Sequence, residues 1–86
     1  MTQARRVYEN DEYAEMMRRM LTGWFRRCAD GDPNDLTELL DASKLLDQGI
    51  RSAVEGQRAR FGTSWTEIGA AAGITRQAAQ QRWGKK

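Results

Sequence analysis

Arg76 and three glutamines near the carboxyl terminus have side chains suited to reading DNA bases. Arginine forks onto O6 and N7 of guanine, and glutamine pairs with N6 and N7 of adenine. The glutamines, Gln77, Gln80 and Gln81, lie three and four residues apart, so a helix would place them on one face with Arg76 beside them. This spacing predicts a recognition helix that enters the major groove of duplex DNA.

The distribution of charge indicates that a polyanion would bind at this end of the chain. Residues 51–86 carry seven Lys/Arg and two Glu, a net charge of +5, whereas residues 29–50 carry one Lys and six acidic residues, a net charge of −5. Glu67 is the only acidic residue after Gln57, so phosphate groups would meet little repulsion. Lys85 and Lys86 are expected to add phosphate contacts.

Enzymatic and metal-dependent functions are disfavoured by what the sequence lacks. The 86 residues include no histidine, which removes the usual general base, the commonest metal ligand and any Ser-His or Cys-His pair. The single cysteine, Cys28, forms neither an intrachain disulfide nor a zinc site, and a free thiol fits a reducing cytoplasm. We therefore expect a cytoplasmic protein with no enzymatic activity, no cofactor and no metal, in which Cys28 packs as a small apolar group.

Acidic and amide side chains between residues 30 and 41 are the one feature that suggests a cation. Their spacing is similar to that of an EF-hand calcium loop, with an aspartate at the closing position. However, Asp35 stands where such a loop turns on a glycine, and Pro33 is stiff. Helix capping is therefore favoured, with Asp32 as the N-cap, Pro33 at the first helical position and Gly31 in a left-handed conformation that ends the preceding helix.

Apolar residues at helical spacing predict two long helices before residue 62. The first begins at Asn10, a plausible N-cap, and carries apolar residues from Tyr13 to Cys28 at intervals of three and four. The second covers residues 33–61, and a continuous helix is favoured over one that breaks at Gly49 or Gly56. Residues 1–9 show no convincing periodicity and are expected to form a loose arm.

Residues 64–83 contain three local signals for two short helices joined by a tight turn. Ser64 and Glu67 fit a capping box, Gly73 suits a turn that needs a positive φ, and Thr75 is placed to cap the following helix. The small residues 69–71 would let the two helices cross closely. The tryptophans are expected to be core residues rather than stacking platforms for bases, and the predicted inward positions are Trp65, Ile68, Ala72, Ile74, Ala79 and Trp83.

The stretch from Trp65 to Trp83, WTEIGAAAGITRQAAQQRW, resembles the bacterial helix-turn-helix family. The resemblance is to small actinobacterial and phage- or plasmid-type regulators and, more loosely, to region 4 of sigma factors, and it covers about a quarter of the chain. Gly69 departs from the alanine of many members and is expected to loosen the first helix without altering the surface. The resemblance implies that the start and outward face of the second helix contact DNA, here Thr75, Arg76, Gln77, Gln80 and Gln81, with Arg82 near the phosphate backbone.

These patterns predict an all-α single domain, residues 1–86, with about four helices. Residues 10–61 would form a helical bundle and dimerisation part, and residues 62–86 the helix-turn-helix part. The first helix has an apolar band wider than one facing helix can cover, which predicts a homodimer. The residues expected at the dimer interface are Met17, Met20, Leu21, Trp24 and Phe25.

The function predicted from the sequence is a transcriptional regulator, a repressor, that binds specific double-stranded DNA sequences. It would act as a homodimer in the cytoplasm, associated with the nucleoid when bound, and without a membrane partner because no apolar run approaches the length of a bilayer span. The alternative is a protein-interaction module, in which Trp24, Phe25 and the leucines of the second helix bind RNA polymerase, a sigma factor or another transcription component.

Overall fold

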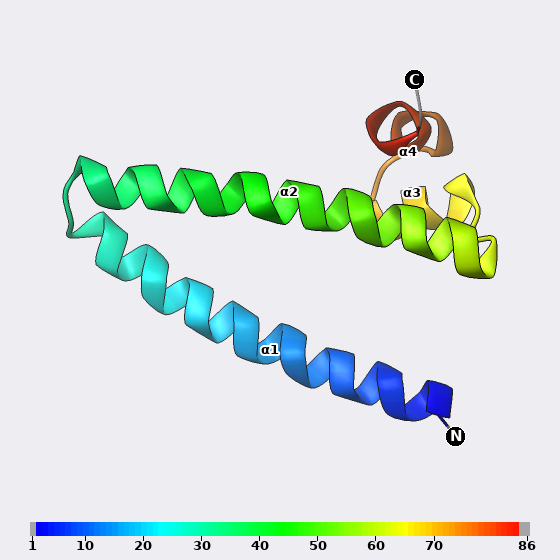
Figure 1. Ribbon diagram of the computed structural model, residues 1–86, viewed down its shortest axis with the longest axis horizontal. Coiled ribbons are helices and arrows are strands. Elements are labelled where there is room, and N and C mark those ends of the chain that lie inside the picture. The colour runs from blue at the N-terminus through cyan, green and yellow to red at the C-terminus, as the bar shows by residue number, and fades with distance from the viewer. Residues whose placement is uncertain (1, 85–86) are drawn as a thin grey trace. The chain divides into compact units, whose positions relative to one another are not determined.

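Four α-helices and no strand make up the part of the chain that the structure describes, which is the backbone of residues 2–84 and the side chains of residues 9–84. In this computed structural model the helices are α1 (Thr2–Ala29), α2 (Pro33–Phe61), α3 (Trp65–Ala72) and α4 (Arg76–Trp83) (Figure 1). The predicted all-α class is confirmed. No helix over this range has an apolar stretch long enough to cross a membrane.

Contacts between residues divide the chain into two compact units, Met1–Leu40 and Asp41–Lys86. The first unit holds α1 and the first turns of α2, and the second holds the rest of α2 with α3 and α4. The boundary lies inside α2, whereas the division predicted from the sequence lies at residues 61 and 62. The single-domain organisation stays a prediction.

Helix α1 is longer than its sequence pattern indicated. It begins at Thr2, so Asn10 is an interior residue and the prediction of a loose arm over residues 1–9 is wrong for the described backbone. The physical reason is that these residues include neither proline nor glycine, so nothing interrupts the helix in its first turns. The side chains of Arg5 and Arg6 lie outside the described residues.

The turn between α1 and α2 is held by two reciprocal capping bonds. The Oδ1 atom of Asp32 accepts from the N–H of Asp35 at 3.4 Å, and Asp35 Oδ2 accepts from the N–H of Asp32 at 3.1 Å. Asp32 Oδ1 also accepts from the N–H of Asn34 at 2.9 Å. Asp32 is therefore the N-cap, with Pro33 as the first helical residue, as predicted. Gly31 does not have the predicted left-handed conformation; a Cβ there would instead collide with the Asp35 carboxylate.

Cys28 is the one buried side chain among the described residues of the first unit. It is 7% exposed, and its thiol donates to the carbonyl of Asp35 with a Sγ–O distance of 3.8 Å. Burial raises the pKa of the thiol, and the carboxylates of Asp35 and Glu38 raise it further. The thiol therefore stays protonated near neutral pH, as expected of a packing residue rather than a nucleophile.

Helix α2 runs without a break through Gly49 and Gly56, which confirms the prediction of a continuous helix. It ends at Phe61, where Gly62 takes a positive φ of 65° and donates its N–H to the carbonyl of Arg58. This left-handed residue turns the chain toward α3.

Few large side chains are buried. The buried apolar residues in the described part of the chain are Cys28, Ile68 and Ala79. In α1 and α2, by contrast, large apolar side chains are exposed at Tyr13, Met16, Met17, Met20, Phe25, Leu36, Leu40, Leu45, Leu46, Ile50 and Phe61. The apolar bands of both long helices are therefore surfaces as well as packing faces.

Candidate nucleic-acid interface

The first short helix, α3, has a complete capping box. Ser64 Oγ accepts from the N–H of Glu67 at 3.1 Å, and Glu67 Oε1 accepts from the N–H of Ser64 at 2.9 Å. At the other end Gly73 has φ 72° and ψ 27°, a left-handed C-cap. The predictions at Ser64, Glu67 and Gly73 are confirmed, and they fix where α3 begins and ends.

Gly69 allows the turn to come close to α3. A Cβ at this position would lie 2.8 Å from the carbonyl oxygen of Ile74 and 3.0 Å from the backbone of Thr75. The backbone is further fixed by a bond from the Ile74 N–H to the Gly69 carbonyl at 2.9 Å. Gly69 is therefore required by close packing and does not loosen α3, contrary to the sequence-based expectation. Its neighbours Ala70 and Ala71 are exposed.

Helix α4 is capped by Thr75 and anchored by Ala79. The Thr75 hydroxyl accepts from the N–H of Ala78 at 3.0 Å, as predicted for an N-cap. Ala79 is 0% exposed, which fixes the inward side of α4. Gln77 and Gln81 lie two positions before and after Ala79, so they point to the opposite, outward side of α4.

The other predicted inward positions of residues 64–83 differ in burial. Ile68 is buried, and Ile74, Trp65 and Trp83 are half-buried. Ala72 is exposed, so its predicted inward position is wrong. It is the last residue of α3, and the chain turns away at Gly73 before anything packs on it.

The structure brings most of the predicted DNA-contacting residues together. Thr75, Arg76, Gln77 and Gln80 line one open recess at the start of α4, and all four are exposed. Gln81 is exposed on the same outward side. Arg82 is exposed but does not line this recess, and its guanidinium stands 5.0 Å from the centroid of the Trp83 ring. Lys85 and Lys86 lie outside the described residues.

Two arginines of α2 that the sequence analysis did not single out hold this segment in the second unit. Arg51 donates from Nη2 to the carbonyl of Arg82 at 2.9 Å and from Nη1 to that of Trp83 at 3.5 Å. Arg58 donates to the carbonyl of Thr63 at 2.9 Å, and its guanidinium lies 4.3 Å from the centroid of the Trp65 ring. Their spacing of seven residues, which places them on one face of α2, was the available signal.

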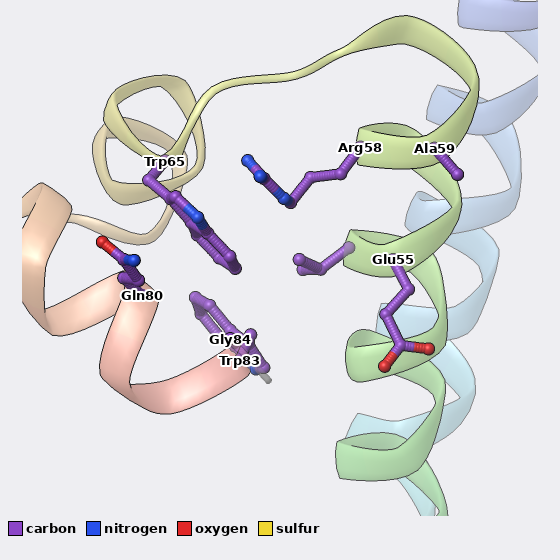
Figure 2. Close-up of a pocket in the computed structure, with 8 residues that line it drawn as sticks. Glu55, Arg58, Ala59, Trp65, Gln80, Trp83 and Gly84 are labelled. Carbon is purple, nitrogen blue, oxygen red and sulfur yellow. The ribbon is translucent and has the colours of Figure 1, made fainter. Parts of the chain in front are cut away.

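Trp65 and Trp83 line an open pocket of about 660 Å³ in the second unit, together with Val54, Arg58 and other residues of α2. Figure 2 shows the two indoles facing α2, with the Arg58 side chain reaching toward Trp65. The pocket leaves part of each indole accessible, which explains why neither tryptophan is fully buried.

The acidic residue of this segment, Glu67, is stabilised in its charged form by local hydrogen bonds. The N–H of Ser64 and then its hydroxyl lower the pKa of Glu67, because both bonds favour the charged carboxylate. Its charge is thus committed to the N-terminus of α3, where it also interacts favourably with the helix dipole. The recess at the start of α4 is lined by no acidic side chain among the described residues.

Comparison with known protein families, with curated proteins and with solved structures found no match for this chain.

Proposed function

We propose that this chain is a sequence-specific, duplex-DNA-binding transcriptional regulator that acts as a homodimeric repressor, with α4 as the helix that enters the major groove. The observation that carries the proposal is the exposed polar side of α4. Three of its side chains, Arg76, Gln77 and Gln80, line the recess beside the Thr75 cap, and Gln81 extends the same side. These are donor and acceptor groups that pair with purine edges.

The backbone at the start of α4 also suits a phosphate group. The first N–H groups of a helix have no intrahelical acceptor and carry the positive end of the helix dipole. The Thr75 hydroxyl accepts from Ala78 and leaves the N–H groups before it open to an anion. Arg76 adds a fixed positive charge beside them, which supports phosphate contact next to base contact.

The packing of α3, α4 and the turn supports precise presentation of these groups. Capping bonds fix both ends of α3, the fully buried Ala79 fixes the rotation of α4, and Arg51 binds its last carbonyls. A recognition helix needs such rigidity, because base contacts are lost when side chains move by about an ångström.

The test is selection of bound sequences from a random duplex pool at two salt concentrations. We expect one motif to be enriched at both concentrations and its affinity to fall steeply with salt, because phosphate neutralisation releases counterions. The absence of an enriched motif at either concentration would exclude sequence-specific binding.

The second candidate is a protein-interaction module for RNA polymerase, a sigma factor or another transcription component. The exposed apolar side chains of α1 and α2 favour it, since such patches usually meet a partner. A complex of that kind would depend little on salt, which separates it from DNA binding.

A further inference from the structure

One side of α1 carries a row of exposed side chains that we call the methionine row: Glu9, Tyr13, Met16, Met20, Gly23 and Arg27. Steps of four and three residues place all six on one side of the helix. In its centre Tyr13 is 64% exposed, Met16 43% and Met20 60%. The row lies entirely within the first unit.

The methionine row is complementary in size and charge to the same row of a second helix that runs in the opposite direction. Its members form three pairs centred on position 18: Met16 with Met20, Tyr13 with Gly23, and Glu9 with Arg27. In each outer pair the members are opposites, a large ring against no side chain and an acid against a base. A surface with this property fits a second copy of itself related by a two-fold axis.

We propose that α1 pairs antiparallel with α1 of a second copy through the methionine row, with the two-fold axis at the level of position 18, on the side of the helix opposite that residue. This rests on the homodimer of the proposed function and specifies how it forms. Met16 and Met20 meet at the centre, and each Tyr13 ring covers Gly23 of the other chain. Of the interface predicted from the sequence the row keeps only Met20. Leu21 and Trp24 are half-buried, and Met17 and Phe25 are exposed but lie on other sides of α1.

The charges of α1 select the antiparallel direction. Residues 9–15 contain four acidic residues and no basic one, and residues 18–27 contain four arginines and no acidic residue. Glu15 and Arg19 meet at the boundary with an N–O distance of 3.5 Å. Antiparallel pairing places the acidic segment 9–15 of each helix beside the basic segment 18–27 of the other, whereas parallel pairing places like charges together.

Gly23 leaves the space that the Tyr13 ring of a second copy needs. A Cβ at this position would meet nothing within 4 Å, and its φ is not positive. Nothing among the described residues therefore requires glycine there, although glycine destabilises the interior of a helix. The Tyr13 ring of a second copy supplies the close contact that excludes a side chain.

The first test exchanges the large and the small residue of the Tyr13–Gly23 pair. Gly23→Tyr should weaken the dimer at least about tenfold, because two large rings then compete for one space. The exchanged variant, Tyr13→Gly with Gly23→Tyr, should recover most of that loss, because each ring again faces a glycine and α1 keeps its number of glycines. Sedimentation equilibrium measures both constants, and circular dichroism checks that the helices remain.

A monomeric wild-type protein at about 100 μM, far above the Kd of a stable dimer, would overturn the proposal. So would a Gly23→Tyr variant that dimerises like the wild type, or an exchanged variant no better than Gly23→Tyr.

The second test measures direction. A nitroxide is attached at Arg26→Cys, outside the methionine row, in a Cys28→Ser protein whose hydroxyl can still donate to Asp35. Position 26 lies eight residues from the axis, so antiparallel helices separate the two labels by about 24 Å along the helix axis, whereas parallel helices leave them roughly 10 Å apart. A single short distance by electron double resonance would exclude the antiparallel pair.

Both measurements are made without DNA, so the two proposals fail separately. A dimer of this form that enriches no sequence contradicts DNA recognition alone. A monomer that enriches one contradicts the homodimer, and with it the antiparallel pair, and leaves DNA recognition by α4 standing.

Discussion

Gln77 points directly away from the packed side of α4, because it lies two residues before the fully buried Ala79. Arg76 precedes it at the first helical position, where side chains reach base edges and phosphates together. We predict that Arg76→Ala and Gln77→Ala each cost about 1–3 kcal/mol of specific DNA binding and relax the preference at one or two base positions. Binding titrations on the selected sequence measure both effects.

Matched controls separate recognition from net charge and composition. Arg60→Ala removes the same charge as Arg76→Ala, and Gln48→Ala the same amide as Gln77→Ala, at exposed positions of α2. Neither control should change base preference. If Arg76→Ala and Gln77→Ala bind the selected site as the wild type does, α4 is not the recognition helix.

Glu67 makes the stability of α3 depend on pH. Its folded pKa is lowered from the ordinary 4.5, so its capping contribution is complete above that value and is lost as the pH falls through the lowered folded pKa. Glu67→Gln keeps an acceptor for the Ser64 N–H but cannot titrate, so this part of the acid dependence should vanish. Thermal unfolding followed from neutral pH to about pH 3 measures it. Identical acid profiles for variant and wild type would contradict the assignment.

Residues that bond to partners nearby in the sequence were predictable, and residues that bond to distant partners were missed. Ser64, Glu67, Gly73 and Thr75 act within three or four positions of their partners, so their types and spacing were sufficient. The spacing of Arg51 and Arg58 places them on one face of α2 but does not identify their partners, and Arg51 bonds to carbonyls more than thirty positions away.

Two helical glycines provide a direct comparison at the scale of the elements. A Cβ at Gly69 would lie 2.8 Å from a backbone oxygen, whereas a Cβ at Gly49 would meet nothing within 4 Å. We predict that Gly69→Ala destabilises the protein by about 1–3 kcal/mol, because the turn must move away from α3. Gly49→Ala should stabilise it by about 0.5–1 kcal/mol, through helix propensity alone. Urea unfolding measures both, and stabilisation by Gly69→Ala would contradict the close contact.

Arg51 joins α2 to the C-terminal end of α4, where a positive charge and hydrogen bonds to carbonyls are both favourable. We predict that Arg51→Ala costs about 0.5–1.5 kcal/mol, with faster hydrogen exchange in the last turn of α4. Arg51→Lys should recover only part of this, because an ammonium lacks the fork that reaches two carbonyls. Unchanged exchange in both variants would show that the contact contributes nothing.

Helix boundaries were predicted correctly where the sequence contains clear start or stop signals. Pro33 marks the start of α2 and Gly73 the end of α3, as predicted, and α2 ends at the predicted residue 61, before the positive φ of Gly62. The start of α1 was placed too late because Asn10 resembles an N-cap, yet a capping residue also occurs inside a helix when good helix formers precede it. Gly49 and Gly56 do not break α2, because glycine weakens a helix without blocking its hydrogen bonds.

For the whole molecule, apolar periodicity predicted helices correctly but not which side chains would be buried. A stripe at helical spacing is the same whether another helix of the chain or a second chain covers it. Leu36, Leu40 and Leu46 belong to such a stripe, and each is more than half exposed. The sequence therefore predicted the fold class, while the partner of these surfaces requires the association experiments.

The symmetry of the proposed homodimer makes a prediction about its DNA. One α4 reads only a few base pairs, whereas two copies related by a two-fold axis read an inverted repeat. We predict that the selected sequences are inverted repeats with half-sites about one helical turn apart, roughly 10–10.5 base pairs, or a multiple of it. Gly23→Tyr leaves α4 untouched, so it should retain the half-site preference but bind the full site more weakly, because the second half-site no longer adds to the affinity. Selection with wild type and variant, followed by titrations on full and half sites, measures this. An enriched motif without inverted symmetry, bound equally by both proteins, would mean that a single copy recognises DNA.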